Sequence, residues 1–132
     1  MAAIGTLAII SYETSTTYYY KSEAPQIINP LESLDLEPTK SNIKMAVSFL
    51  SNQYGLNESQ LFKVIECESG YNPDAIGDGG YAVGILQFHK STFKQYCKGS
   101  YYSTKDQLTC AAKMWKAGQQ RHWTCYVKNF GK

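Results

Sequence analysis

The segment that decides the fold runs from Asn57 to Ala75 and reads NESQLFKVIECESGYNPDA. Its apolar residues Leu61, Val64 and Ile65 recur at the spacing of one helical face, which predicts a helix that packs against a core. The asparagine at its start is a preferred N-cap residue, and Gly70 can adopt the left-handed conformation that ends a helix. The segment therefore predicts a helix between these two residues.

A glutamate lies in the middle of this apolar face. At about 100° per residue, Glu68 projects within about 20° of Leu61, whereas Glu66 lies about 160° from Glu68 and points to solvent. A carboxyl group in apolar surroundings keeps its proton more readily, as a general acid near neutral pH must. The alternative is that the side chain of Glu68 reaches water because Gly70 ends the helix.

The segments around this helix also predict helical structure. Apolar spacing predicts a helix from a cap at Ser41 to Gly55, a short helix that follows Ser91 to about residue 97, and a helix over 103–118. The glycine-rich segment 72–84 predicts tight turns and a small hairpin. The sequence therefore predicts a mainly α domain with a small hairpin lobe.

The net charge of +2 divides into two unlike parts. Residues 1–38 carry five acids and one base, and residues 39–132 carry twelve bases and six acids. We interpret 1–38 as a tail whose apolar run over 2–10 is a signal-peptide core or an anchor remnant, with a short strand or a disordered tail as alternatives. Residues 11–39, rich in Ser, Thr and Pro, are typical of a linker. The folded module is predicted at 39–132.

The basic module favours an anionic partner. Eleven of its twelve bases are lysines, and Arg121 is the single arginine. Because readers of nucleic acid rely on arginine forks, the pattern favours a cell-wall polymer or a membrane surface over nucleic acid. No stretch reaches the roughly 18–20 apolar residues of a membrane span, so we expect no stable membrane insertion, and we expect a monomer.

Two blocks after the glutamate resemble a known signature. The blocks Glu68-Ser-Gly-Tyr-Asn-Pro-Asp-Ala75 and Gly84-Ile-Leu-Gln87-Phe88 are similar to those of the soluble lytic transglycosylase family and the related goose-type lysozymes. The resemblance covers roughly residues 60–125. It implies a mainly α (α+β), lysozyme-like single domain without a cofactor. It also implies cleavage of the β-1,4 bond between N-acetylmuramic acid and N-acetylglucosamine in peptidoglycan.

The resemblance also implies roles for individual residues. Glu68 would protonate the glycosidic oxygen, and Ser69 would orient the glutamate or bind near the cleaved bond. Gly84 would let the backbone approach a sugar ring, and Gln87 would bind N-acetyl or hydroxyl groups. Separately, from the positions of the tyrosines, we expect Tyr71 and Tyr81 to flank the predicted floor of the cleft. The alternatives are a solvated helix end for Ser69, a turn for Gly84 and a surface amide for Gln87.

The reaction outcome depends on a second carboxylate. Hydrolases ordinarily use a pair of carboxyl groups, whereas lytic transglycosylases use the 6-hydroxyl of the sugar. Asp78 could position a water molecule across the cleft, or it could only form the turn. We favour a transglycosylase, with a hydrolase or a catalytically silent wall-binding module as alternatives. Tyr126 is a candidate for the late tyrosine of the family, or a core aromatic.

Four cysteines lie in the module, and their even number suggests one or two disulfides in an extracytoplasmic setting. Three pairings are possible, and the sequence does not choose among them. The alternative is a Cys3His zinc site that would include His122, but structural zinc normally uses close ligand pairs, and only His122-x-x-Cys125 is close. We therefore expect no metal, and we interpret His89 and His122 as surface or packed imidazoles.

Overall fold

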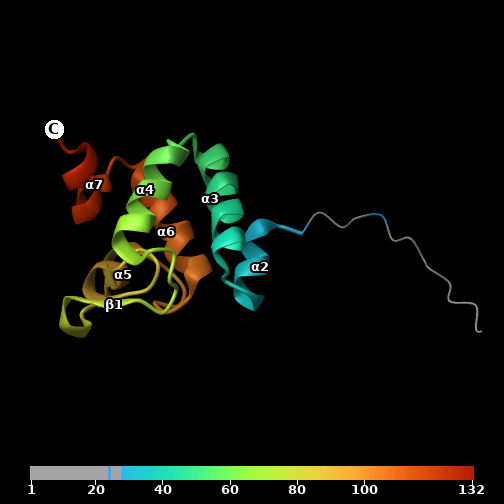
Figure 1. Cartoon of the computed structure of the whole chain (residues 1–132), viewed down its shortest axis with the longest axis horizontal. Coiled ribbons are helices and arrows are strands. Elements are labelled where there is room, and N and C mark those ends of the chain that lie inside the picture. Colours follow the sequence, from blue (N-terminus) through green and yellow to red (C-terminus); the bar gives the residue numbers. More distant parts are fainter. Residues whose placement is uncertain (1–23, 25–27) are drawn as a thin grey trace, which may run out of the picture.

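The computed structural model describes Ala24 and residues 28–132. The apolar run over 2–10 lies outside the described residues, so its interpretation stays a prediction. In the described part, the chain forms six α-helices and a small three-stranded antiparallel sheet (Figure 1). The predicted fold class, a mainly α lysozyme-like domain, is confirmed.

The helices are α2 (Pro30–Leu36), α3 (Lys40–Tyr54), α4 (Glu58–Ser69), α5 (Lys90–Tyr96), α6 (Thr104–Lys116) and α7 (Thr124–Phe130), and the strands are β1 (Ile76–Gly77), β2 (Ala82–Val83) and β3 (Phe88–His89).

Side-chain caps set where the predicted helices begin and end. The Asn57 side chain accepts a backbone hydrogen bond in the first turn of α4, and Gly70 ends that helix with a φ of 60°. Ser103 caps α6 in the same way. The cap predicted at Ser41 is wrong, because the hydroxyl of Thr39 accepts the first-turn hydrogen bond of α3. Threonine is also a good N-cap residue, so pattern alone did not distinguish the two positions.

Helix α2 contradicts part of the linker predicted over 11–39. Pro30 occupies the first turn of this helix, where its missing N–H needs no partner, and Asn29 caps it. Leu34 is only 3% exposed and belongs to the hydrophobic core. Pro30, one of the prolines that suggested a linker, thus begins a helix, and the packed structure includes residues before the predicted start at 39.

The glycine-rich segment forms the sheet. β1 and β2 pair with Ile76 opposite Val83, which confirms the predicted hairpin, and β3 adds a third strand with Val83 opposite Phe88. A single turn of 3-10 helix (Asp78–Gly80) connects β1 to β2. In Figure 1 the sheet and α5 lie at the end of α4 that carries Glu68.

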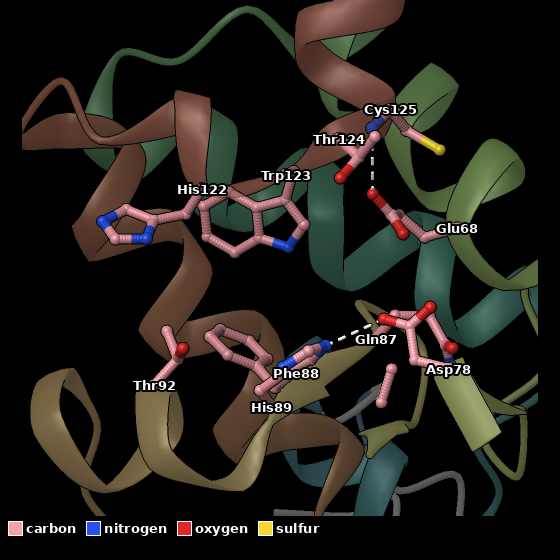
Figure 2. A pocket seen from close by; sticks show the side chains of 11 residues that line it. Glu68, Asp78, Gln87, Phe88, His89, Thr92, His122, Trp123, Thr124 and Cys125 are labelled. Carbon is pink, nitrogen blue, oxygen red and sulfur yellow. Dashed lines mark hydrogen bonds and ion pairs between the residues drawn. The ribbon is translucent and has the colours of Figure 1, made fainter. Parts of the chain in front are cut away.

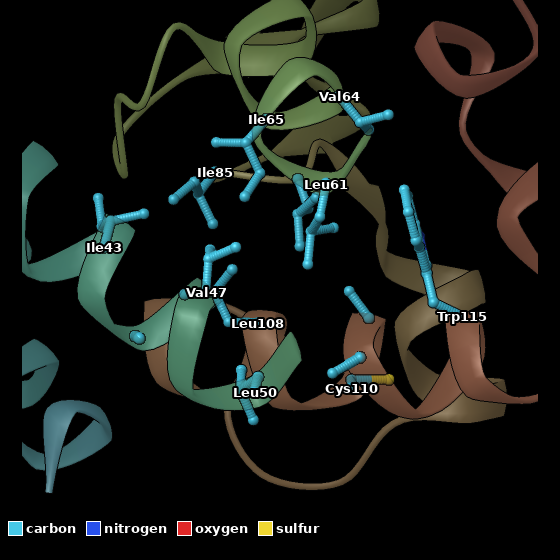
Figure 3. Close-up of a cluster of buried hydrophobic side chains, with 14 of the residues drawn as sticks. Ile43, Val47, Leu50, Leu61, Val64, Ile65, Ile85, Leu108, Cys110 and Trp115 are labelled. Atoms are coloured by element: carbon cyan, nitrogen blue, oxygen red, sulfur yellow. The ribbon is translucent and has the colours of Figure 1, made fainter. Parts of the chain in front are cut away.

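Helix α3 packs against both α4 and α6, and the core lies between these helices. Figure 3 shows its side chains pointing toward one another. Its fully buried members include Ile43, Val47, Leu50, Leu61, Val64, Ile65, Ile85 and Leu108. The apolar face predicted for α4 is therefore confirmed.

The four cysteines form two disulfides, Cys67–Cys125 and Cys97–Cys110. The first joins the end of α4 to α7, and the second joins the end of α5 to α6. These bonds use every cysteine of the chain, so the alternative of a zinc site with cysteine ligands is wrong. Separately, none of the helices in residues 28–132 has the length and apolar character needed to cross a bilayer.

Candidate active site

Glu68 is the penultimate residue of α4, and its carboxyl group faces a cavity of about 540 Å³ (Figure 2). The wall of the cavity comes from the end of α4, the sheet, α5 and the start of α7. The lining residues are Glu68, Asp78, Ala82, Gln87, Phe88, His89, Thr92, His122, Trp123, Thr124 and Cys125. The cavity thus combines two carboxyl groups and two imidazoles with the apolar side chains of Ala82, Phe88 and Trp123.

The surroundings of Glu68 raise the pKa of its carboxyl group above the ordinary value of 4.5. Burial is the largest cause, because it disfavours the charged form. The backbone N–H of Cys125 donates to Oε1 over 3.1 Å, which lowers the pKa, and the charge of Asp78 raises it. Burial and the nearby charge outweigh the hydrogen bond, so Glu68 retains its proton to a higher pH than a free glutamate.

Asp78 lies across the cavity from Glu68 (Figure 2). It has a φ of 49°, an uncommon left-handed conformation for a residue other than glycine. Its Oδ2 lies 2.9 Å from Nε2 of His89, and both side chains are exposed to solvent, by 69% and 50% respectively. The turn and the histidine together hold the aspartate toward the cavity, so Asp78 both forms the turn and faces the candidate acid.

Gln87 also lines the cavity, but its amide nitrogen is already engaged. Nε2 donates to the carbonyl groups of Ala75 (3.1 Å) and Gly84 (2.8 Å). An amide NH2 has two donors, and these two carbonyls match them. A substrate contact by Gln87 would therefore fall to its oxygen, while the nitrogen stabilises the turn before β3.

Four of the described residues that were predicted at the site, Tyr71 among them, lie outside the lining of this cavity. The hydroxyl of Ser69 donates to the carbonyl of Ile85 over 2.7 Å and so joins α4 to the β2–β3 turn. Gly84 is buried against the side chain of Gln107. Tyr81 is 75% exposed on the sheet lobe.

The prediction from sequence missed the contribution of the chain around α7. Trp123 is 4% exposed, lines the cavity, and donates from Nε1 to the carbonyl of Leu86 over 3.0 Å. Cys125 supplies the N–H to Glu68. Tyr126 packs against Trp115, in the manner of a core aromatic. The signal in the sequence was Cys67, which directly precedes Glu68 and could bring a distant cysteine to it, but the pairing with Cys125 is known only from the structure.

The two histidines, interpreted as surface or packed imidazoles, both lie at the cavity wall. His89 pairs with Asp78, and His122 packs edge to face against Tyr96 with ring centroids 5.2 Å apart. Both residues are exposed, so the surface interpretation is correct as far as burial is concerned. Their position on the cavity is a feature that only the fold reveals.

A comparison with protein families gives one match, to the family described as the transglycosylase SLT domain, over residues 45–121. Comparisons with curated proteins and with solved structures returned no match. The matched region covers more than half of the 132 residues and includes Glu68, Asp78 and Gln87. The chain therefore belongs to the transglycosylase SLT domain family.

Proposed function

We propose that this chain is a peptidoglycan lytic transglycosylase that cleaves the β-1,4 bond between N-acetylmuramic acid and N-acetylglucosamine. The observation that carries the proposal is Glu68, a half-buried carboxyl group with a raised pKa in a polar cavity of an SLT domain. The basic charge of residues 39–132 suits an anionic wall. The two disulfides suit an extracytoplasmic location.

In this mechanism Glu68 acts first as an acid and then as a base. Its proton passes to the glycosidic oxygen while the bond between that oxygen and C1 of the muramic acid breaks. The carboxylate then takes the proton of the 6-hydroxyl group, whose oxygen bonds to C1 and closes a 1,6-anhydro ring. The proton returns to Glu68, so a single carboxyl group is sufficient.

A hydrolase is the second candidate function, and the position of Asp78 is the observation that supports it. Asp78 lies across the same cavity, and its charge raises the pKa of Glu68. In a hydrolase, Asp78 would orient a water molecule toward C1, and the product would carry a reducing end. The partner of Asp78, His89, would then hold the aspartate in place.

The role of Glu68 is tested by Glu68→Gln, with Glu66→Gln as the matched control on the same helix. Glu66 is exposed to solvent and lies outside the cavity lining, so its substitution changes the charge of α4 without changing the site. We expect Glu68→Gln to abolish lysis of purified walls, measured as loss of turbidity, while its thermal unfolding midpoint stays unchanged. We expect Glu66→Gln to lyse the walls as the unsubstituted chain does. Full lysis by Glu68→Gln would overturn the mechanism.

Mass spectrometry of the released muropeptides distinguishes the candidate functions. Anhydro-muramyl ends identify a transglycosylase, and reducing ends identify a hydrolase. Asp78→Asn should lower the rate strongly only in the hydrolase. Binding to walls without any loss of turbidity by the unsubstituted chain would instead identify a catalytically silent wall-binding module.

A further inference from the structure

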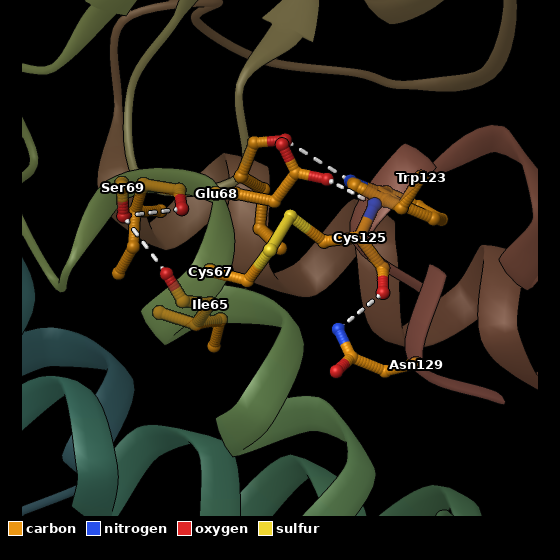
Figure 4. The surroundings of a disulfide bond; sticks show 9 residues. Ile65, Cys67, Glu68, Ser69, Trp123, Cys125 and Asn129 are labelled. Atoms are coloured by element: carbon orange, nitrogen blue, oxygen red, sulfur yellow. Dashed lines mark hydrogen bonds between the residues drawn. A yellow bond between two sulfur atoms is a disulfide. The ribbon is translucent and has the colours of Figure 1, made fainter. Parts of the chain in front are cut away.

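The candidate acid and its hydrogen-bond donor are joined by a covalent bond. Cys67 directly precedes Glu68 in α4, and its sulfur is bonded to Cys125, whose own N–H donates to Oε1 of Glu68 (Figure 4). The disulfide spans 58 residues of sequence, with 5.9 Å between the two Cα atoms. The end of α4 and the start of α7 are thus held together at the carboxyl group itself.

Within the described residues, the N–H of Cys125 is the protein group that hydrogen-bonds to this carboxyl group. The other titratable groups at the cavity are Asp78 in the turn between β1 and β2, His89 at the end of β3, and His122 in the 3-10 turn before α7. Glu66, on α4 itself, is exposed to solvent. A change in the position of the N–H therefore acts directly on Glu68.

We propose that the Cys67–Cys125 disulfide positions Glu68 for proton transfer by holding the N–H of Cys125 on Oε1, which leaves Oε2 to carry the proton toward the substrate. This inference rests on the proposed function, because it assigns a role to the surroundings of the same acid. Cys125 is a positioning residue and does not itself take part in the chemistry. Preorganisation of this kind is effective because small misplacements of a catalytic group have large effects on rate.

The hydrogen bond also sets the pH range in which the acid works. An N–H that donates to the carboxylate favours the charged form, so its loss raises the pKa of Glu68 further. The reaction begins with the protonated carboxyl group, so activity falls as the pH rises through this pKa. Loss of the N–H should therefore move the alkaline limb of the pH profile to higher pH.

The second disulfide provides a matched control. Cys97–Cys110 spans 13 residues and joins the end of α5 to α6, outside the lining of the cavity that contains Glu68. Replacing each pair by serines removes one cross-link in each case. Of the two replacements, only Cys67→Ser/Cys125→Ser removes the bond that holds the N–H of residue 125 against Glu68.

The experiment compares the pH dependence of kcat/KM for wall lysis in the full chain, in Cys67→Ser/Cys125→Ser and in Cys97→Ser/Cys110→Ser. In Cys67→Ser/Cys125→Ser we expect the alkaline limb to lie about one pH unit higher, because a charge-assisted hydrogen bond to the carboxylate is lost. We also expect kcat/KM to fall roughly tenfold or more, because the carboxyl group is no longer held in position. We expect the control to keep the limb of the unsubstituted chain. Alkaline limbs that coincide in all three proteins would overturn the proposal.

A second measurement needs neither lysis nor a folded serine variant. In the unsubstituted chain, the 13C resonance of the Glu68 carboxyl group and the 15N resonance of the Cys125 amide are followed against pH. We expect one shared midpoint, and no titration of the Cys125 amide in Glu68→Gln. A shared midpoint in a protein that does not lyse walls would contradict the proposed function and support the positioning. If the Cys125 amide resonance does not change as Glu68 titrates, the positioning is overturned.

Discussion

Replacing Gly84 by alanine tests the packing beneath the candidate site. Gly84 has a φ of 86°, a conformation that residues with a side chain rarely adopt. An added Cβ would lie 2.7 Å from the side-chain amide carbon of Gln107 and closer still to its nitrogen. Gln107 is 1% exposed, so its side chain has no solvent into which it could move.

The amide of Gln107 connects three parts of the chain. Its nitrogen donates to the carbonyls of Val83 (3.1 Å) and Tyr101 (2.7 Å), and its oxygen accepts from the N–H of Leu86 (3.4 Å). Displacing it would leave buried polar groups without partners, which costs about 1–3 kcal/mol of unfolding free energy. The left-handed backbone adds about 1–2 kcal/mol for a residue with a Cβ.

The matched control is Gly118→Ala. Gly118 has a φ of 78°, and an added Cβ would meet no atom within 4 Å, so this variant carries only the backbone penalty. Urea unfolding with the disulfides intact should therefore show a further loss of about 1–3 kcal/mol in Gly84→Ala. When Gln107 is also replaced by alanine, Gly84→Ala should lower the free energy of unfolding only by the cost of the left-handed backbone conformation. Equal losses in Gly84→Ala and Gly118→Ala would refute the reasoning.

Three further outcomes are expected in urea unfolding. Leu34→Ala should lower the free energy of unfolding by about 2–5 kcal/mol, because Leu34 is buried at 3% exposure; a change below about 0.5 kcal/mol would mean that α2 does not pack. Trp123→Phe should lower it by about 1–3 kcal/mol, because the buried carbonyl of Leu86 loses its donor; an unchanged midpoint would argue against this hydrogen bond. The raised pKa of Glu68 contributes stability that is present below 4.5 and is lost as the pH rises through the folded-state pKa. Glu68→Gln should therefore gain stability relative to the unsubstituted chain as the pH rises above 4.5, and a difference independent of pH would contradict the raised pKa.

Of the residues predicted at the site, Glu68, Asp78 and Gln87 line the cavity, whereas Ser69, Gly84, Tyr71 and Tyr81 do not. Glu68 was found because its neighbours in α4 mark an apolar face, and Asp78 because it follows in the glycine-rich segment. Gly84 was expected to approach a sugar, but its close neighbour is Gln107, which lies on α6. No local pattern indicates which side chain a glycine faces, because that partner is set by packing.

The features that could be predicted from the sequence depend on interactions between residues that are close together in the chain. Apolar spacing, the cap at Asn57 and the left-handed end at Gly70 all act within a turn or two of α4, so they specify this helix and the side of it that carries Glu68. Helix α2 escaped prediction because Pro30 is equally compatible with a linker and with a first helical turn.

Only the tertiary structure decided what surrounds the carboxyl group. The donor to Glu68 lies 57 residues away and is a backbone N–H, a group that every residue except proline carries and that no motif marks. The pairing of Cys67 with Cys125 likewise depends on how α4 and α7 pack, and the contact of Asp78 with His89 depends on how β3 pairs in the sheet. The sequence therefore pointed to Glu68 as the candidate acid, and the fold supplied the hydrogen bond, the burial and the charge that shift its pKa.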